Sequence, residues 1–277
     1  MTEPAGAPGP DLSVIIPTHD RIATLPAAVE SVLAQRHRNL ELIVVDDASR
    51  DATPAYLAGL ADPRLRTLRL ASRAGANVAR NRGAAMARAP VLSFLDSDDL
   101  YHPHRAEAAL AALGPGARAP LHLSSFLHED GRDRRALANA DAVISARALE
   151  YRTIADQLEV SCSGISIRQE AFAAVGGFDE GVRRLQDRDL LLRLARRVGA
   201  ILTSAPNWTK RRMSDSMSVP RAGRIAAYAA LYHRHPVIAE RYALLFRHRI
   251  AHQIARPVLK FRPDVALRML REAGADP

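Results

Sequence analysis

The sequence contains little of what builds disulfide scaffolds, sulfur-ligated metal sites or membrane spans. Cys162 is its one cysteine, which excludes an internal disulfide and a CxxC metal site and is typical of a cytoplasmic protein. No uncharged apolar run approaches about 18 residues, so we expect no membrane-spanning segment. Residues 1–10 (MTEPAGAPGP) lack the basic and apolar regions of a signal peptide, and we expect a disordered lead-in there.

Lysine is also scarce, since Lys210 and Lys260 are the only two lysines among 39 basic residues, and the other 37 are arginines. The net charge is +9. Residues 1–100 contain 11 basic and 12 acidic residues, whereas residues 221–277 contain 11 and 4. The positive charge is therefore concentrated in the C-terminal segment, away from the motifs described below. We predict no nucleic-acid partner.

What the sequence does contain is a regular alternation of short β-branched runs and helical spacing over its first 100 residues. Strands are predicted at residues 12–17, 40–45, 65–70 and 91–95, and helices at residues 24–35, 53–61 and 76–88. This alternation predicts an α/β fold with a mostly parallel, Rossmann-like central sheet flanked by helices.

Beyond residue 100 the pattern is less regular. Helices are predicted at residues 102–113, 168–175 and 187–198, strands at 120–127 and 162–167, and a turn at 176–180, while 128–160 stays unassigned. After Pro220 the sequence is helical in character and basic. We predict one domain over 11–219, with halves 11–100 and 101–219, followed by a helical extension over 220–277.

Polar clusters directly follow three of the predicted strands: Pro17–Asp20, Asp46–Asp47 and Asp96–Asp99. Ligands of open α/β sheets bind at the carboxyl ends of the strands, so these clusters should converge on one site. Two carboxylates separated by one residue, Asp96 and Asp98, suit a divalent cation that bridges a diphosphate. A surface turn or a helix N-cap is the alternative interpretation of each acidic cluster.

Asp187 and Asp189 begin the predicted helix 187–198, where capping and a general base are both open interpretations. Together the segments are similar, in order, to the family-2 glycosyltransferases, which have the GT-A fold, invert the anomeric centre and use nucleoside-diphosphate sugars. The matching segments over about residues 11–218 are SVIIPTHDR, VVDDAS, NVARNRG, FLDSDD, GGFDE and QDRDLLLRLA.

The resemblance implies roles for individual residues. The implied nucleotide-sugar site comprises Pro17, Thr18, Asp20, Asp46, Asp47, Arg73, Arg80, Asp96, Ser97, Asp98 and Arg211. Within it, Asp47 reads the base, Asp98 holds Mn²⁺ or Mg²⁺ beside the diphosphate, and Asp96 contacts the ribose or the metal. Asp187 is the implied general base. Met213 replaces a late histidine of the family, so Arg211 or Arg212 is expected to hold the phosphates.

Two other functions remain as alternatives: a sugar-phosphate nucleotidyltransferase, whose glycine-rich triphosphate loop is missing from PTHDRIAT, and an inactive glycosyltransferase-like binding module. The expected partners are a nucleotide sugar, with UDP favoured, and a carbohydrate, lipid-linked or small-molecule acceptor in glycan or natural-product biosynthesis. The C-terminal extension is expected to pack on the domain or a second subunit, or to rest on anionic lipid at the inner membrane face.

Overall fold

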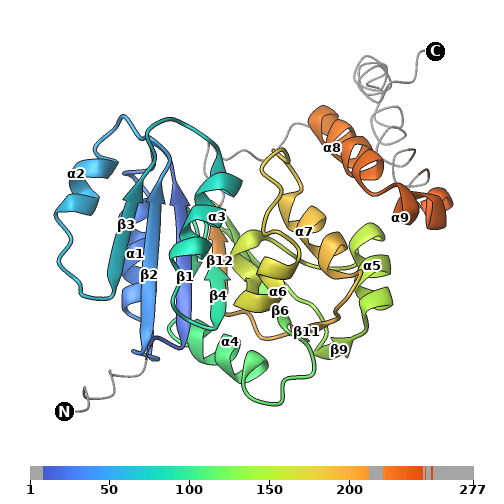
Figure 1. The fold of residues 1–277 in the computed structure, drawn as a ribbon, viewed down its shortest axis with the longest axis horizontal. Helices are drawn as coiled ribbons and strands as arrows, with labels where there is room; N and C mark the ends of the chain where they lie inside the picture. The colour runs from blue at the N-terminus through green and yellow to red at the C-terminus, as the bar shows by residue number, and fades with distance from the viewer. Residues whose placement is uncertain (1–8, 212–220, 246, 248–250, 252–277) are drawn as a thin grey trace, which may run out of the picture. The chain divides into compact units, whose positions relative to one another are not determined.

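The computed structural model describes residues 9–211, 221–245, 247 and 251 (Figure 1). The chain divides into two compact units, one formed by residues 1–149 and 159–213 and the other by residues 150–158 and 214–277. Of the lead-in expected at residues 1–10, only residues 9 and 10 are described. Arg212 and Met213 also lie outside the described residues.

The larger unit contains an eight-stranded sheet of order β3-β2-β1-β4-β10-β6-β11-β9. Its strands are β1 (Leu12–Thr18), β2 (Leu40–Asp46), β3 (Leu65–Arg69), β4 (Val91–Phe94), β6 (Leu121–Ser124), β9 (Ala142–Ile144), β10 (Ile165–Arg168) and β11 (Ala200–Thr203). The first four strands are mutually parallel, and β10 runs antiparallel between β4 and β6. The predicted α/β fold with a mainly parallel sheet is confirmed.

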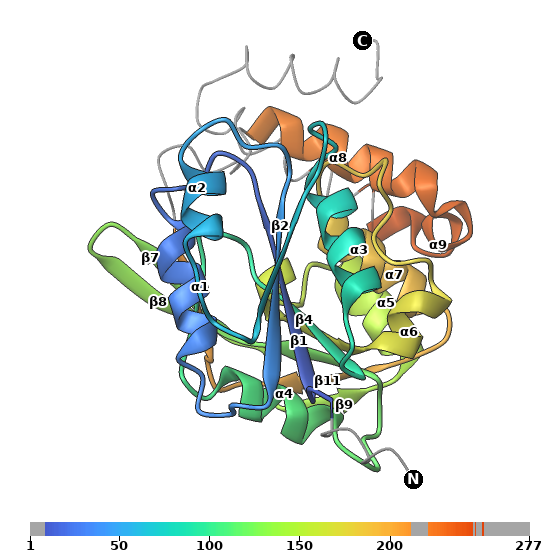
Figure 2. The same ribbon diagram turned by 60° about the vertical axis from the view of Figure 1, so that its left-hand side comes forward.

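Side chains along β1 point alternately to the two faces of the sheet, and helices cover both faces. Leu12, Val14 and Ile16 belong to the same buried core as the apolar side of α1 (Leu25–Leu33). Ile15 points the other way, toward α3 (Ala76–Met86), where a Cβ on Gly83 would lie 2.5 Å from its Cγ2. Only glycine therefore allows α3 to approach β1 this closely. Figure 2 shows α1 and α3 on opposite sides of the strands.

A second, four-stranded sheet has the order β5-β12-β7-β8. Its strands are β5 (Leu100–Tyr101), β7 (Phe126–Asp130), β8 (Asp133–Leu137) and β12 (Trp208–Arg211). The sequence predicted none of β8, β11 and β12. The single strand expected at residues 120–127 is wrong, because it divides at Ser125 into β6 and β7 of different sheets, and Ser125 instead bonds to the carbonyl oxygen of Thr203.

The remaining predicted elements are present with shifted ends. The helices are α2 (Thr53–Ala58), α4 (Arg105–Leu113), α6 (Gln169–Ala174) and α7 (Gln186–Leu194). The strand expected at residues 162–167 begins late, because Cys162–Gly164 form a 3₁₀ turn, η1, before β10. Gly164 lies against Trp208, where an added Cβ would come within 3.2 Å of the indole nitrogen.

The smaller unit is helical in its described part, with α8 (Arg221–Arg234), α9 (Pro236–Arg241) and the second half of α5 (Ala146–Ile154). Tyr228 and Leu231, two of the apolar positions expected to pack, are buried. Leu244, another of them, is 82% exposed. Of the other positions in that expectation, Leu245 is partly buried, while the side chain of Ile225 and residues Ile250 and Ile254 lie outside the description. Among the described helices, none is long and apolar enough to cross a membrane.

His122 makes the stability of the fold depend on pH. It is buried on β6, its Nε2 lies 2.9 Å from Thr203 Oγ1, and burial together with the charge of Arg105 lowers its pKa to about 3. Below pH about 6.5, the usual pKa of histidine, His122 is protonated in the unfolded chain but stays neutral in the folded protein. This contribution to stability is complete above pH 6.5 and declines toward pH 3, by about 1.4 kcal/mol for each pH unit.

When the pH falls from 7 to 5, the free energy of unfolding should decrease in both proteins. We expect the decrease to be about 2 kcal/mol smaller in His122→Gln than in the wild type. Urea unfolding at the two pH values measures this difference. His104→Gln, which removes a partly exposed histidine, is the matched control and should keep the wild-type dependence. Equal pH dependence in His122→Gln and the wild type would show that His122 titrates normally in the folded protein.

Candidate functional site

The three polar clusters follow strands that are neighbours in the sheet. β1 lies between β2 and β4, with Thr18 paired to Asp46 and Ile15 paired to Phe94. The loops after β1 and β2 are joined directly, since Asp47 N–H donates to the carbonyl oxygen of Thr18 at 2.8 Å. The carboxyl ends of these strands thus form one edge with the acidic residues upon it.

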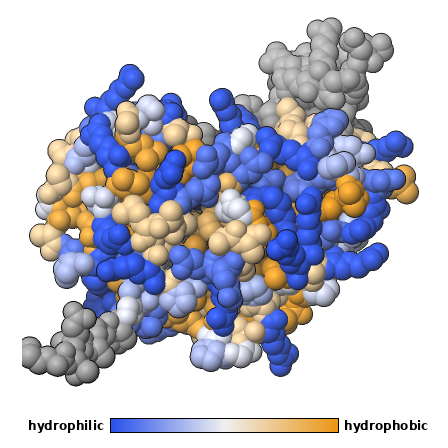
Figure 3. Space-filling view, viewed as in Figure 1, coloured by the Kyte–Doolittle hydropathy of each residue, from blue (hydrophilic) through white to orange (hydrophobic). Residues whose placement is uncertain are grey.

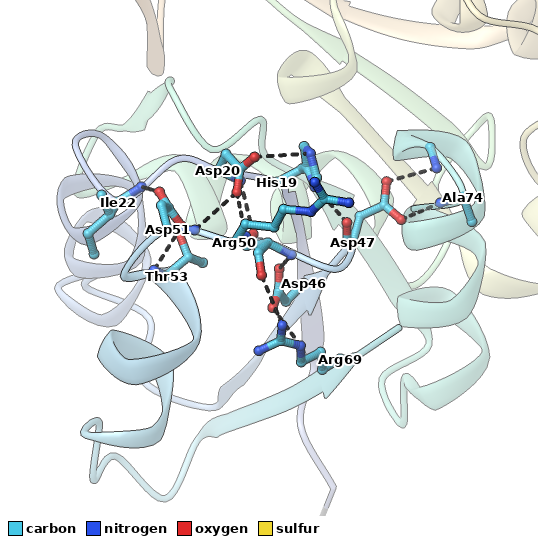
Figure 4. A network of polar contacts seen from close by, with 12 residues as sticks. His19, Asp20, Ile22, Asp46, Asp47, Arg50, Asp51, Thr53, Arg69 and Ala74 are labelled. Carbon is cyan, nitrogen blue, oxygen red and sulfur yellow. Dashed lines mark hydrogen bonds and ion pairs between the residues drawn. The ribbon is translucent and has the colours of Figure 1, made fainter. Parts of the chain in front are cut away.

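Asp20 ties the first two loops together (Figure 4). Its Oδ1 accepts hydrogen bonds from the backbone N–H groups of Arg50 at 2.6 Å and Asp51 at 3.3 Å. Its own N–H donates to Ser49 Oγ at 2.9 Å. The bond from Arg50 is the main cause that lowers the pKa of Asp20. Asp20 is exposed and shapes the loop through its backbone partners.

Asp46 and Asp47 differ in how their carboxylates are occupied. Asp47 accepts from the N–H groups of Ala74 at 2.6 Å and Gly75 at 2.8 Å, one on each oxygen, which fixes the backbone at the start of α3. Asp46 Oδ1 accepts from Ser49 N–H. Its buried Oδ2 accepts no hydrogen bond from the described residues, but it lies 3.6 Å from Arg69 Nε in an ion pair. The charge of Asp46 is thus compensated by Arg69, while Oδ2 keeps the capacity to accept a hydrogen bond.

Other residues of the expected nucleotide pocket lie on the same edge. Pro17 and Thr18 are buried at the end of β1, and Thr18 Oγ1 also has no hydrogen-bond partner within the described chain. Arg73 is exposed in the loop before Ala74, next to the segment that Asp47 holds. Ser97 is buried within the Asp96–Asp99 loop.

The Asp96–Asp99 loop after β4 is held by Ser163 of η1. The Ser163 hydroxyl donates to Asp99 Oδ2 at 2.6 Å and accepts from Asp96 N–H at 3.0 Å. Asp99 is 2% exposed, and burial raises its pKa to about 8. Asp99 does not cap a helix, because β5 follows it and α4 begins only at Arg105. Its role is to anchor the loop that presents Asp96 and Asp98.

Asp96 and Asp98 fit a divalent cation. Burial, reinforced by the charge of Asp96, raises the pKa of Asp98, so a cation beside these groups would relieve an existing electrostatic cost. Carboxylate oxygens are the donors that Mg²⁺ and Mn²⁺ prefer. Within the described chain no three His, Cys, Asp or Glu side chains form a complete ligand set, so a diphosphate and water would have to supply the remaining ligands.

Arg80 of α3 connects the acidic loop to the turn at residues 176–180. Its Nη2 lies 2.6 Å from Asp96 Oδ1, and its guanidinium stacks over the Phe178 ring at 5.3 Å. The guanidinium is almost completely buried, with 3% of the side chain exposed. A buried charge of this kind is stable because its carboxylate partner lies beside it.

Two asparagines of NVARNRG hold the same turn. Asn81 bonds reciprocally with the backbone of Phe178, accepting its N–H at 2.9 Å and donating to its carbonyl oxygen at 2.8 Å. Asn77 donates to the carbonyl oxygens of Asp179 and Val182. Gly177 has φ +70°, and an added Cβ would lie 2.6 Å from Asn81 Oδ1, so glycine is required there. These contacts were not predicted.

Asp187 lies in the first turn of α7, after Leu185, which has the left-handed φ of 57°. Such a conformation costs a bulky residue about 1–2 kcal/mol and is often found at functional sites. The negative charges of Asp99, Asp96 and Asp187 outweigh the effect of burial and raise the pKa of Lys210. Asp187 thus contributes to the same electrostatic environment as the acidic loop and Lys210.

Asp189 has a different environment from Asp187. It is 2% exposed and pairs with Arg193 Nε at 2.9 Å. Arg193 in turn donates to the carbonyl oxygens of Val175 at 2.7 Å and Gly177 at 2.6 Å. Asp189 thus braces the turn before α7, and of the two aspartates only Asp187 remains as a candidate base.

β12 completes the site with Lys210 and Arg211. Arg211 Nε donates to the carbonyl oxygen of Asp98 at 3.0 Å, and its buried Nη2 has no partner in the part of the chain that is described. Lys210 was not predicted as a site residue, although it is one of only two lysines. The resemblance assigned the adjacent Arg211 to the site, but β12 was not recognised from the sequence and Lys210 was not included.

A shallow depression lies elsewhere on the larger unit, between α1 and α2. It has a volume of about 530 Å³, and its apolar lining includes Val29, Leu33, Tyr56 and Leu60. Apolar side chains also show among hydrophilic ones over α2 and β3 in Figure 3. None of the residues described above lines the depression, so we place the site at the strand ends.

Comparison with known proteins fits this geometry. The model of "Glycosyl transferase family 2" matches residues 13–175. The chain belongs to this family. The succinoglycan biosynthesis protein ExoO of Rhizobium meliloti is 36% identical over 142 residues, which are 51% of this chain and 41% of ExoO. The glucosyltransferase WfgD of Escherichia coli, named for UDP-Glc and a diphosphoundecaprenol-linked GlcNAc, is 33% identical over 37% of this chain and 40% of WfgD.

Solved structures share the fold of this glycosyl transferase family 2 chain. Staphylococcus aureus TarS in complex with UDP-GlcNAc superposes with a TM-score of 0.65 at 17% identity, over 80% of this chain and 65% of that one. The mannosyltransferase PcManGT of Pyrobaculum calidifontis, in complex with GDP-Man and Mn²⁺, gives 0.65 at 18% identity over 97% and 76%. The GT-A fold is thereby shown. This chain spans less than two thirds of the length of its first curated relatives, 41% of ExoO and 61% of an uncharacterised Haemophilus influenzae glycosyltransferase.

Proposed function

We propose that the protein transfers a sugar from a nucleoside-diphosphate sugar, with UDP favoured, to an acceptor hydroxyl and inverts the anomeric centre. The supporting observation is that one edge of the sheet unites the acidic pair Asp96 and Asp98, the candidate base Asp187, the buried Arg80 and the partly buried Lys210. Family membership supports the same reaction class.

The nucleoside binds at the ends of β1 and β2 in this proposal. Thr18 Oγ1 and Asp46 Oδ2 are buried and form no hydrogen bond with the described atoms, so both can bond to a base or a ribose. Asp46 Oδ2 also forms an ion pair with Arg69 Nε at 3.6 Å. Asp47 is the proposed base reader. In the structure its oxygens accept from Ala74 and Gly75, so a base would share this carboxylate with the loop before α3.

The diphosphate lies at the Asp96–Asp99 loop. Mn²⁺ or Mg²⁺ held by Asp98 and Asp96 would neutralise the charge that grows on the departing nucleoside diphosphate. Arg211 supplies a guanidinium whose Nη2 is not engaged by any described residue and suits a phosphate oxygen. Arg80 keeps Asp96 in place through the 2.6 Å contact.

Asp187 removes the proton of the acceptor hydroxyl. At the same time, the hydroxyl oxygen bonds to C1 of the donor sugar, and the bond from C1 to the diphosphate breaks. Attack from the face opposite the leaving group inverts the anomeric centre in one displacement. The acceptor class proposed is a growing glycan or its lipid-linked precursor, in line with the diphosphoundecaprenol-linked substrate in the name of WfgD.

A panel of nucleotide sugars tests the proposal. One or more of UDP-Glc, UDP-GlcNAc and GDP-Man should be hydrolysed slowly with Mn²⁺ and should raise the melting temperature. At a ligand concentration of 100 times Kd, binding adds about 2.7 kcal/mol to the free energy of unfolding. UMP and free glucose are the controls, since neither carries a diphosphate. If no diphosphate or sugar diphosphate stabilises or is turned over with either metal, the proposed function is wrong.

A further inference from the structure

Lys210 is a partly buried cation in the middle of the site. It lies on β12, next to Arg211, whose backbone N–H donates to Asp99 Oδ1 at 3.3 Å. Its Nζ donates to Ser161 Oγ at 3.1 Å. Ser161 is two residues before Ser163, which holds both ends of the acidic loop. Hydrogen bonds on both sides therefore fix Lys210 beside the Asp96–Asp99 loop.

Among the described residues, no acidic side chain forms an ion pair with the Lys210 ammonium group. An ammonium has three N–H donors, and Ser161 takes one of them. Over the described residues, no carboxylate oxygen lies within salt-bridge distance of Nζ, although the charges of Asp99, Asp96 and Asp187 keep the pKa of Lys210 raised. Burial removes part of the hydration of this charge, which is costly unless something else compensates it. An anionic ligand bound at the Asp96–Asp99 loop would compensate the positive charge of Lys210.

We infer that Lys210 is a fixed cation of the donor site, which binds the diphosphate directly and supplies part of the positive charge otherwise provided by a divalent metal. The inference rests on the proposed function and adds a residue to its donor site. Two opposite effects follow from one charge: Lys210 attracts the diphosphate, and it repels a metal ion from Asp96 and Asp98.

Two titrations of the full-length protein separate these effects. In EDTA, the wild type should bind UDP or GDP measurably, and Lys210→Gln should bind it about 10- to 100-fold more weakly, the range for a lost hydrogen bond to a charged group. Without nucleotide, Lys210→Gln should bind Mn²⁺ more tightly than the wild type. Lys210→Arg, which keeps the charge, should retain most of the metal-free affinity.

Arg135→Gln is the matched control, because it removes one positive charge from the exposed strand β8 and should change neither affinity. Lys210→Met, which keeps the aliphatic stem, repeats the test, and thermal unfolding without ligand verifies that each variant is folded. Loss of folding in both Lys210→Gln and Lys210→Met, or a parallel loss of nucleotide and Mn²⁺ affinity, would assign Lys210 a structural role and overturn the inference.

The outcomes also separate the inference from the proposed function. If the nucleotide binds only with Mn²⁺, or if Lys210→Gln keeps the wild-type affinity in EDTA, Lys210 is no diphosphate ligand, and the proposed function stands. If neither UDP nor GDP binds with or without metal, both are overturned. Weaker metal-free nucleotide binding together with tighter Mn²⁺ binding supports the inference, because a structural defect does not produce opposite changes.

Discussion

Asp187→Asn should lower the rate of sugar transfer about 10²–10⁴-fold, the usual range for a lost general base. The amide keeps the size of the side chain but cannot take the acceptor proton. Donor affinity should change little, because Asp187 is proposed to act on the acceptor hydroxyl, while other residues hold the diphosphate. Steady-state kinetics with the donor identified by the panel should show a loss in kcat and an almost unchanged donor KM.

Asp189→Asn is the control for that variant, since it alters the neighbouring aspartate of the same helix. The Asp189–Arg193 pair braces the turn before α7, so its loss should cost roughly 1–3 kcal/mol of stability. Turnover by the folded fraction should fall much less than in Asp187→Asn. Near-normal transfer by Asp187→Asn, with a large loss in Asp189→Asn, would identify Asp189 as the base.

Asp98→Ala should abolish the increase in melting temperature that a nucleoside diphosphate produces with Mn²⁺ or Mg²⁺. Without ligand, the variant should be at least as stable as the wild type. The sign follows from the raised pKa: above that pKa the carboxylate of Asp98 is ionised at a cost due to burial and to Asp96, and alanine removes that cost.

Differential scanning fluorimetry with UDP, with and without Mn²⁺, measures both effects. Asp133→Ala, on the exposed strand β8, is the matched control and should keep the ligand-induced shift. A full metal-dependent shift in Asp98→Ala would show that the metal binds elsewhere. A much lower melting temperature without ligand would instead show that Asp98 stabilises the fold.

The part of the fold that the sequence predicted well is the parallel half of the sheet. Strands β1 and β2 are buried on both faces, so they appear in the sequence as continuous apolar runs such as Leu12–Pro17. Polar residues that follow such runs must lie at one edge of the sheet, which is why three separate clusters could be assigned to one site. That inference needs only the direction of the strands.

The rest depended on contacts between distant segments. β8, with the sequence DRRAL, is exposed along most of its length and is a strand only because β7 pairs with it. The hydrogen bonds that the backbone N–H groups of Ala74 and Gly75 donate to Asp47 depend on the path of a loop, which sequence periodicity does not predict. Lys210 reaches the site through β12, whose partners are β5 and β7, far away in the chain.

The position of α3 has a consequence for the geometry of the proposed reaction. Through Asn77, Arg80 and Asn81, this helix contacts both Asp96 and the turn that leads to the candidate base. In the proposed mechanism, one helix therefore sets the separation between the departing diphosphate and the group that accepts the proton. The exposed strand β8 makes none of these contacts. Substitutions on β8 should therefore leave that separation unchanged.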